Sequence, residues 1–264
     1  MTIIEAIILG IIQGLTEFLP VSSSGHLELG TVLLGVATND NLLFTIVVHG
    51  ATALSTIVVF RKDILQLVIE FLQFRWNDST QFVVKLFISM IPVGVVGVLF
   101  EDKIEALFGG QVLLVGAMLL VTGLLLLFTY FKEHTYGKVS YGKAFIIGMA
   151  QALAIMPGIS RSGATISTAL LLGVDKEKAT RFSFLMVLLP ILGAMLLKVK
   201  KLMEGPEVAA DISIVAILVG FIAAFISGLF ACKWMISIVK KGKLIYFAVY
   251  CLIVGSIAIV ASLL

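Results

Sequence analysis

The sequence predicts an all-α polytopic membrane protein, with six transmembrane helices and two re-entrant helix-loop-helix hairpins arranged as an inverted-topology internal repeat. Three observations lead to this fold class: the composition, the lengths of the apolar segments, and a polar motif that occurs twice. Hydrophobic residues make up 60% of the 264 residues and charged residues 13%, and the mean hydropathy is +1.14. That is too little charge to cover a soluble protein of this size. We therefore expect a single membrane domain over 1–264.

The first hairpin is predicted from two apolar arms on either side of a polar stretch. The arms, residues 3–12 and 27–36, are each about half as long as a membrane span requires. Between them lies QGLTEFLPVSSSGH, residues 13–26. Pro20 suits the break because it lacks an amide hydrogen, and a serine that follows it can cap the next helix. Irregular backbone at membrane depth needs protein or water around it, so this loop is expected to line a cavity.

Three apolar segments that are long enough to cross a bilayer follow, and the pattern then starts again. The first three expected spans are 42–60, 82–100 and 112–131. A second pair of short arms, 144–155 and 164–174, surrounds the sequence PGISRSG. The last three expected spans are 182–197, 212–232 and 244–264. The chain therefore divides into two repeat units of one plan, about 1–131 and about 141–264.

A constant offset of 138 residues, as from Gln13 to Gln151, aligns the two hairpins. The identities at this offset are Ala6 with Ala144, Gly10 with Gly148, Gln13 with Gln151, Leu15 with Leu153, Ser22 with Ser160, Ser24 with Ser162, and Gly25 with Gly163. Chance similarity between apolar segments matches leucines but seldom serine, glycine and glutamine together. Each unit has three spans, an odd number, so the second unit is expected upside down relative to the first. The two hairpins would then meet near the midplane.

Lysine and arginine counts predict the orientation. The loops 61–81, 132–143, 175–181 and 233–243 hold thirteen basic residues, against three in the loops 101–110 and 199–211. The positive-inside rule then places both termini, and the opening of the site, on the outer side. The formal net charge of +3 is small and scattered, so no nucleic-acid partner is expected.

The two polar stretches each carry a charge that is costly in a membrane. Glu17 and Gln13 are four residues apart, hence on one face of a helix, and a carboxylate there is a functional candidate by default. The plainer alternative is a carboxylate satisfied by neighbouring hydroxyls. Arg161 is a counter-ion for Glu17, or part of an anion cradle with Ser160 and Ser162 at a helix start, or both at once. Phosphate is the ligand that this pattern predicts.

Three serines and two histidines add to the candidates. Serines at a helix start are usually caps, so each of Ser22, Ser23 and Ser24 has that plain interpretation. A serine becomes a nucleophile when a base is near, and His26 and Glu17 are both within a turn or two. His49, inside an expected span, has a packing role and a site role as equal alternatives.

QGLTEFLPVSSSGH and the later PGISRSGAT together resemble the signature pair of the bacterial undecaprenyl-diphosphatase family, membrane enzymes associated with bacitracin resistance. The family pattern has an acidic residue or glutamine, three residues, a glutamate, a PxSSSGH-like loop, and later PGxSRSxxT. The segments IPVGVVGVLFEDKIE, VVFRKDI and ATRFSFLM extend the resemblance over most of the chain. The departure is Gln13, where many members have glutamate, which weakens any scheme with two carboxylates for a metal.

The resemblance implies a phosphatase of the bacterial cytoplasmic (inner) membrane that hydrolyses undecaprenyl diphosphate and so recycles the lipid carrier for cell-wall synthesis. It also implies a divalent cation, Mg²⁺ or else Ca²⁺, with Glu17 as the candidate ligand. The expected catalytic residues are Glu17, Ser23, His26 and Arg161. The expected diphosphate-binding residues are Ser22, Ser24, Gly25, Ser160, Ser162 and Thr165, with Gln13 and His49 behind them. Whether Ser23 or water attacks stays open, as does a homodimer.

A polyprenyl-phosphate transporter or flippase is the alternative function. Inverted repeats with broken helices that meet at the midplane are a transporter architecture. The hydroxyls and the histidine beside Glu17 and Arg161 favour the enzyme, because binding alone does not need them.

Overall fold

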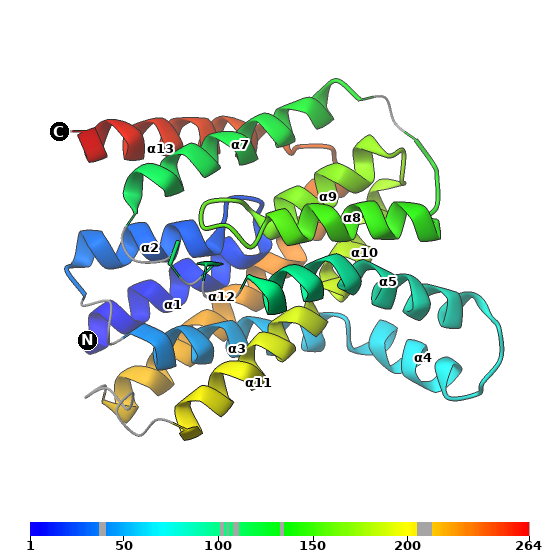
Figure 1. Ribbon diagram of the computed structural model, residues 1–264, viewed down its shortest axis with the longest axis horizontal. Coiled ribbons are helices and arrows are strands. Elements are labelled where there is room, and N and C mark those ends of the chain that lie inside the picture. Colours follow the sequence, from blue (N-terminus) through cyan, green and yellow to red (C-terminus); the bar gives the residue numbers. More distant parts are fainter. Residues whose placement is uncertain are drawn as a thin grey trace.

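The chain folds into helices joined by short loops (Figure 1). The computed structural model describes residues 1–36, 41–100, 103–104, 106–107, 111–132, 135–204 and 213–263. The helices of the first half are α1 (Ile3–Phe18), α2 (Ser23–Leu34), α3 (Asn41–Val59), α4 (Arg61–Phe71), α5 (Asp78–Leu99) and α7 (Val112–Tyr130). Those of the second half are α8 (Tyr141–Leu153), α9 (Arg161–Leu171), α10 (Lys176–Met186), α11 (Leu188–Glu204), α12 (Ile214–Lys240) and α13 (Ile245–Leu263). The described part contains no β-strand longer than an isolated bridge, so the all-α prediction is confirmed.

The multi-pass membrane prediction is also confirmed. Within the described ranges, five segments are long and apolar enough to cross a membrane: Asp78–Leu99, Val112–Tyr130, Lys176–Leu197, Ile214–Lys240 and Ile245–Leu263. A sixth is obtained if Leu43–Val59 and Arg61–Phe71, which are bent by 76° at their junction, are counted as one. Each of the six overlaps one expected span.

Helix α4 is the main departure from the expected element boundaries, because it occupies part of a segment expected to be a loop. Three of its exposed apolar residues, Leu65, Val68 and Ile69, are followed just beyond its end by Leu72. This spacing of three and four residues is the spacing of one helix face. Many charged neighbours masked the pattern in the sequence.

The helix breaks occur where the sequence predicts them. Helix α1 ends at Phe18, and Ser22 caps α2 by accepting a hydrogen bond from the Gly25 amide. In the second half α8 ends at Leu153, and Ser160 caps α9 in the same way. Serine at these two positions satisfies backbone donors that a helix start otherwise leaves unpaired.

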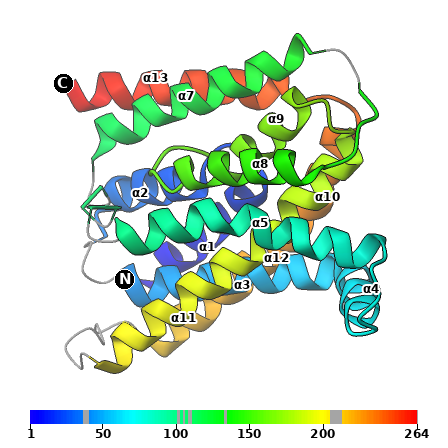
Figure 2. The ribbon, with the colours of Figure 1, turned by 45° about the vertical axis from the view of Figure 1, so that its right-hand side comes forward.

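The two helix pairs enter the molecule from opposite ends. In Figures 1 and 2, α1 and α2 extend inward from the end that carries both termini, whereas α8 and α9 extend inward from the other end. The loops that join each pair lie between, in the middle of the molecule. This arrangement brings the two polar stretches together at the centre of the fold.

Small residues allow close contacts between long helices. Helix α1 packs along α12, α8 along α5 and α7 along α13. A Cβ atom added to Gly10 would meet the carbonyl of Gly220, and one added to Gly148 would meet the backbone of Ser89. A Cβ on Gly116 would lie 2.9 Å from the carbonyl oxygen of Gly255. Glycine lets helix backbones approach this closely in a membrane, where packing rather than water drives association.

An aromatic cluster supports the carboxyl end of α1. The ring of Phe184 lies 5.9 Å from that of Phe18 and 5.9 Å from that of Phe60. All three side chains are buried. Because Phe18 directly follows Glu17, this packing of α1, α3 and α10 fixes the direction in which Glu17 points.

Candidate functional site

The two polar loops touch one another. The Ser162 hydroxyl donates a 3.2 Å hydrogen bond to the carbonyl oxygen of Leu19. A Cβ on Gly25 would lie 3.1 Å from Cα of Gly158, so the second helix of one pair approaches the loop of the other closely at a glycine. Residues about 140 positions apart in the chain therefore form one site.

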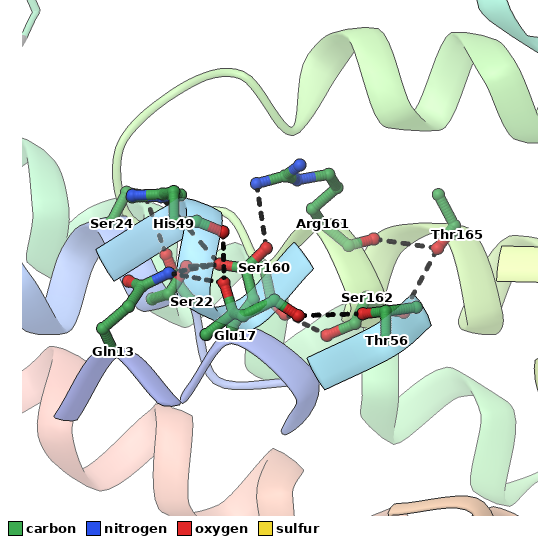
Figure 3. A network of polar contacts seen from close by, with 12 residues as sticks. Gln13, Glu17, Ser22, Ser24, His49, Thr56, Ser160, Arg161, Ser162 and Thr165 are labelled. Carbon is green, nitrogen blue, oxygen red and sulfur yellow. Dashed lines mark hydrogen bonds and ion pairs between the residues drawn. The ribbon is translucent and has the colours of Figure 1, made fainter. Parts of the chain in front are cut away.

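Glu17 is the centre of the polar network (Figure 3). Its side chain is 6% exposed. Oε2 accepts hydrogen bonds from Ser23 Oγ at 2.6 Å and from Gln13 Nε2 at 3.0 Å. Oε1 lies 3.2 Å from a guanidinium nitrogen of Arg161, and His49 Nε2 lies 4.0 Å from Oε2. The sequence-predicted neighbours of this carboxylate are thus brought together, and a buried charge is compensated by donors on every side.

Arg161 connects this network to a small pocket. Its side chain is 26% exposed, and within the described residues its ion pair is the one with Glu17. The polar residues that line the pocket are Glu17, Thr56, Arg161, Ser162, Thr165 and Ser183. A guanidinium has five donors in a fixed fork, so the pair with Glu17 leaves most of them for a ligand. The counter-ion and anion-binding interpretations of Arg161 are therefore compatible.

The serines divide into two kinds. Ser22 Oγ accepts from the Gly25 amide at 3.2 Å and lies 3.3 Å from Ser24 Oγ. In the second loop Ser160 Oγ accepts from the Gly163 amide at 3.0 Å and lies 3.2 Å from Ser162 Oγ. The first serine of each loop is thus a cap. Ser23 alone of the serine triplet has its hydroxyl on the carboxylate.

The backbone at Ser22 is strained. Its φ of 71° is in the left-handed region, which residues other than glycine seldom adopt. The turn places its side chain over the start of α2 and directs Ser23 toward α1. Strained residues of this kind cluster at functional sites.

Thr165 and Gly25 contribute to the site through contacts with the backbone. Thr165 lines the pocket, and its hydroxyl donates to the carbonyl oxygen of Arg161 at 2.9 Å. This bond lies within the first turn of α9, so the Thr165 hydroxyl steadies the segment that carries Arg161. Gly25 supplies its amide to the cap on Ser22 and packs against the second loop.

Of the two histidines expected at the site, His49 and not His26 has a ring nitrogen beside the Glu17 carboxylate. His26 Nδ1 lies 2.8 Å from the carbonyl oxygen of Ser22, and Nε2 lies 2.8 Å from the Tyr250 hydroxyl. Neither contact reaches Glu17 or Arg161. His49, which was expected behind the site, is the histidine beside the carboxylate. A catalytic role for His26 stays a prediction.

Several site residues were not predicted from the sequence. Thr52, Thr56 and Ser183 line or support the site, and Thr122 on α7 holds the second loop. The Thr122 hydroxyl accepts from the Ser160 amide at 3.0 Å and lies 3.2 Å from the carbonyl oxygen of Gly158. Thr52 and Thr56 follow His49 at helical spacing, which was an available signal; Thr122 and Ser183 are lone hydroxyls in apolar sequence.

Gln13 and Glu17 carry the two side-chain oxygen donors to be weighed as ligands of the implied divalent cation. The described residues contain no group of three or more histidine, cysteine or acidic side chains that could form a complete metal cage. Gln13 is fully buried, and its Oε1 has no hydrogen-bond partner while its Nε2 donates to Glu17. One carboxylate and one amide oxygen, completed by substrate phosphates, are a donor set that Mg²⁺ accepts.

Comparison with known proteins gives one consistent result. The family model described as bacitracin resistance protein BacA matches residues 6–257. The chain is 58% identical to the undecaprenyl-diphosphatase of Christiangramia forsetii over 262 residues, which is 98% of both chains. It is 54% identical over 264 residues to that of Bacteroides thetaiotaomicron, covering 100% of both, and 40% identical over 279 residues to that of Methanobrevibacter smithii, covering 100% of this chain and 99% of the other. This chain, with its two polar loops joined at Glu17, belongs to the bacitracin resistance protein BacA family.

Proposed function

We propose that this chain is an undecaprenyl-diphosphate phosphatase, which hydrolyses undecaprenyl diphosphate to undecaprenyl phosphate and inorganic phosphate. The observation that carries the proposal is the position of the Ser23 hydroxyl. It lies 2.6 Å from the Glu17 carboxylate, which also forms an ion pair with Arg161. The undecaprenyl-diphosphatases that match over nearly their whole length support the same reaction. In a cell this activity recycles the lipid carrier of cell-wall synthesis.

The diphosphate head binds on the second loop. Arg161 offers charge and paired donors, which suit phosphate oxygens. Ser162 and Thr165 line the same pocket, and the first amides of α9 add the positive end of a helix. Phosphate binding draws the guanidinium partly away from Glu17. Arg161 then stabilises the charge that develops on the terminal phosphoryl group.

Ser23 is the nucleophile that this geometry favours. Glu17 takes the serine proton as Oγ attacks the terminal phosphorus. The bond from that phosphorus to the bridging oxygen breaks, and Glu17 passes the proton to the departing undecaprenyl phosphate. Water then attacks the phosphoserine, gives a proton to Glu17, and releases inorganic phosphate. That proton returns to Ser23.

Direct attack by water is the competing route. In that case Glu17 or His26 accepts the proton of water, and Ser23 only orients the carboxylate through its hydrogen bond. His26 has no described contact with Ser23 or Glu17, so the structure favours Glu17 as the proton acceptor in either route.

Gln13 and Glu17 would hold the divalent cation at the edge of the phosphate site. Bound there, Mg²⁺ would neutralise charge on the diphosphate oxygens. Activity should fall when a chelator removes divalent cations and return when Mg²⁺ or Ca²⁺ is added. Full activity in excess chelator would contradict the assignment.

The inverted repeat is part of the proposal, with units of about 1–131 and about 141–264. Gly10 and Gly148, at the offset of 138 residues, make the close contacts of α1 with α12 and of α8 with α5. Gly116 and Gly255 contact each other reciprocally. A Cβ added to Gly116 would lie 2.9 Å from the carbonyl oxygen of Gly255, and one added to Gly255 would lie 2.8 Å from that of Gly116. Reciprocal contact is what a two-fold axis between α7 and α13 produces. The opposed helix pairs are then two re-entrant hairpins.

We further propose that the basic loops face the cytoplasm, in the bacterial inner membrane, with both termini and the site opening on the outer side. In Figure 1 both termini lie at one end of the molecule, and α4, the start of α8, α10 and the turn between α12 and α13 lie at the other. The charge counts of the loops support the same polarity. A homodimer stays a prediction, to be tested by the mass of the purified protein in detergent.

Phosphate release by the purified protein tests the function. Given a polyprenyl diphosphate and Mg²⁺, the wild type should release inorganic phosphate, and Ser23→Ala and Arg161→Ala should each lose about 100-fold or more of kcat/KM. Arg181→Ala is the matched control, because Arg181 pairs with Asp63 away from the polar loops. No release by the wild type would overturn the phosphatase in favour of the transporter. Activity that survives in Ser23→Ala but not in Glu17→Gln would identify water as the nucleophile.

A further inference from the structure

Tyr250 makes a contact with the first polar loop that the proposed reaction does not explain. It lies on α13, more than 220 residues from that loop in the chain. Its hydroxyl is 2.8 Å from His26 Nε2. The two rings have centroids 5.6 Å apart and planes within 15° of each other. The tyrosine is 42% exposed, so it reaches the histidine from the rim of the fold.

The contacts of His26 define which ring nitrogen carries hydrogen. The Ser22 carbonyl oxygen, 2.8 Å from Nδ1, can only accept a hydrogen bond. Nδ1 therefore carries hydrogen in every protonation state that keeps this contact. In the neutral ring Nε2 is then the acceptor, and the Tyr250 hydroxyl is its donor. In the protonated ring Nε2 donates, and the same hydroxyl rotates to accept.

Helix α13 contacts both the loop between α1 and α2 and the first turn of α2, with adjacent residues. Cys251 Sγ lies 3.6 Å from the carbonyl oxygen of Pro20 in the loop, and the Tyr250 hydroxyl contacts His26 on α2. Both histidine nitrogens thus have partners supplied by the fold. A histidine with a packing role alone does not require a hydroxyl at Nε2, because a ring that is partly exposed can be solvated there.

We propose that Tyr250 is a positioning residue for His26, which holds Nε2 directed along one line until a phosphate oxygen or water replaces the tyrosine hydroxyl. This inference rests on the proposed function in so far as His26 acts on the diphosphate. It assigns Nε2 as the atom through which His26 acts. It also explains why the ring contacts of His26 are to Ser22 and Tyr250 and not to Glu17: the ring is held by α13.

The ¹⁵N NMR signals of the histidine rings test the hydrogen bond without any assay of activity. The chain has three histidines, so His26→Gln identifies the His26 signals by difference in protein labelled at histidine. The wild type should give an Nδ1–H ring with a hydrogen-bonded, unprotonated Nε2. Tyr250→Phe keeps the ring but removes the hydroxyl, and should shift the Nε2 signal. Tyr246 lies one turn away on α13 and is 66% exposed, so Tyr246→Phe should leave the Nε2 signal unchanged. Unchanged His26 signals in Tyr250→Phe would overturn the inference.

Kinetics test the consequence for the reaction. Tyr250→Phe should lower kcat about three- to tenfold, which is the range expected for one hydrogen bond, and leave KM within about twofold. In the His26→Gln background the same change should have no further effect, because the two residues act as a unit. An equal loss in both backgrounds, or no loss in either, would overturn the positioning role. A wild type that releases no phosphate would instead contradict the proposed function, and the NMR result would still decide whether Tyr250 orients His26.

Discussion

At the scale of single residues, the site depends on how one buried carboxylate is compensated. Glu17 accepts from Ser23 and Gln13 and faces Arg161, so its charge is stabilised inside a membrane protein. The shortest of these contacts is to the hydroxyl of Ser23, the proposed nucleophile. The structural role of Glu17 and its proposed catalytic role thus use the same contacts.

Glu17→Gln should separate these two roles. The amide has the same shape but cannot take a proton from Ser23, and it leaves Arg161 without its counter-ion. We expect kcat to fall about 100-fold or more, the usual range for loss of a general base. Phosphate release measured against Glu28→Gln, the same change on the neighbouring helix α2, checks the effect. An equal loss in both variants would mean that Glu17 has no special role.

The serine triplet illustrates how far residue types alone can carry the argument. The sequence predicts a serine cap for the helix after Pro20 and offers a serine as a candidate nucleophile, but it does not say which serine has which role. The structure gives the cap to Ser22 and the carboxylate contact to Ser23. The φ of 71° at Ser22 turns the chain between them, and no local pattern in the sequence signals that turn.

At the scale of elements, α7 supports the second loop through one hydroxyl. Thr122 bonds both the Ser160 amide and the carbonyl oxygen of Gly158, so it fixes the loop that leads into Arg161. Both backbone groups are buried, and an unpaired buried group is costly.

Thr122→Val should leave these two groups without a partner at nearly constant volume. We expect a loss of about 1 to 3 kcal/mol of stability and a raised KM, because the phosphate-binding loop is no longer held. Thermal unfolding and phosphate release measure the two effects. Thr129→Val, on the same helix, removes a hydroxyl whose described bond is to the Leu126 carbonyl of its own helix. It should change neither quantity appreciably, and a similar effect there would contradict the explanation.

Close helix packing is the second prediction at this scale. Gly148→Ala would press a methyl group into the backbone of Ser89 on α5, and Gly10→Ala would do the same against Gly220 on α12. Each should destabilise the protein by about 1 to 3 kcal/mol, and by similar amounts if the two contacts are repeat-related. Gly94→Ala, where nothing lies within 4 Å, should be neutral or slightly stabilising. Melting temperatures in detergent, followed by tryptophan fluorescence, compare the three.

At the scale of the whole molecule, the two proposed repeat units carry different polar residues at matching positions. The offset that aligns Gln13 with Gln151 places Ile155 where the first half has Glu17, and Arg161 where it has Ser23. The first half therefore supplies the carboxylate and the hydroxyl, and the second supplies the positive charge. Neither half contains a complete site.

The proposed orientation can be tested by labelling cysteines in intact cells. Cys232 and Cys251 are both buried, so the wild type should react slowly with a membrane-impermeant maleimide. Lys103→Cys, at an exposed position in a predicted outer loop, should react, and Lys138→Cys, exposed in a predicted inner loop, should react only after the cells are opened. The reverse pattern would invert the topology and place the site opening on the cytoplasmic side.

The sequence by itself determined the membrane class, most spans, the two breaks and the set of candidate residues around Glu17 and Arg161. These follow from local quantities: hydropathy over about 20 residues, the lack of a donor at proline, and the cost of charge in a bilayer. The sequence also predicts the repeat, because the identities at the offset of 138 residues are visible without any fold. Helix α4 was missed since its apolar face is interrupted by charges.

Only the tertiary structure decided which of these residues meet. His49 lies beside Glu17 while His26 is held by Tyr250, and Thr122 supports the second loop from a helix that looked featureless. The physical reason is that such contacts depend on how helices rotate and approach one another. Glycines at the interfaces and the phenylalanine cluster next to Glu17 set that rotation. Their contacts join residues far apart in the chain, which sequence periodicity does not reveal.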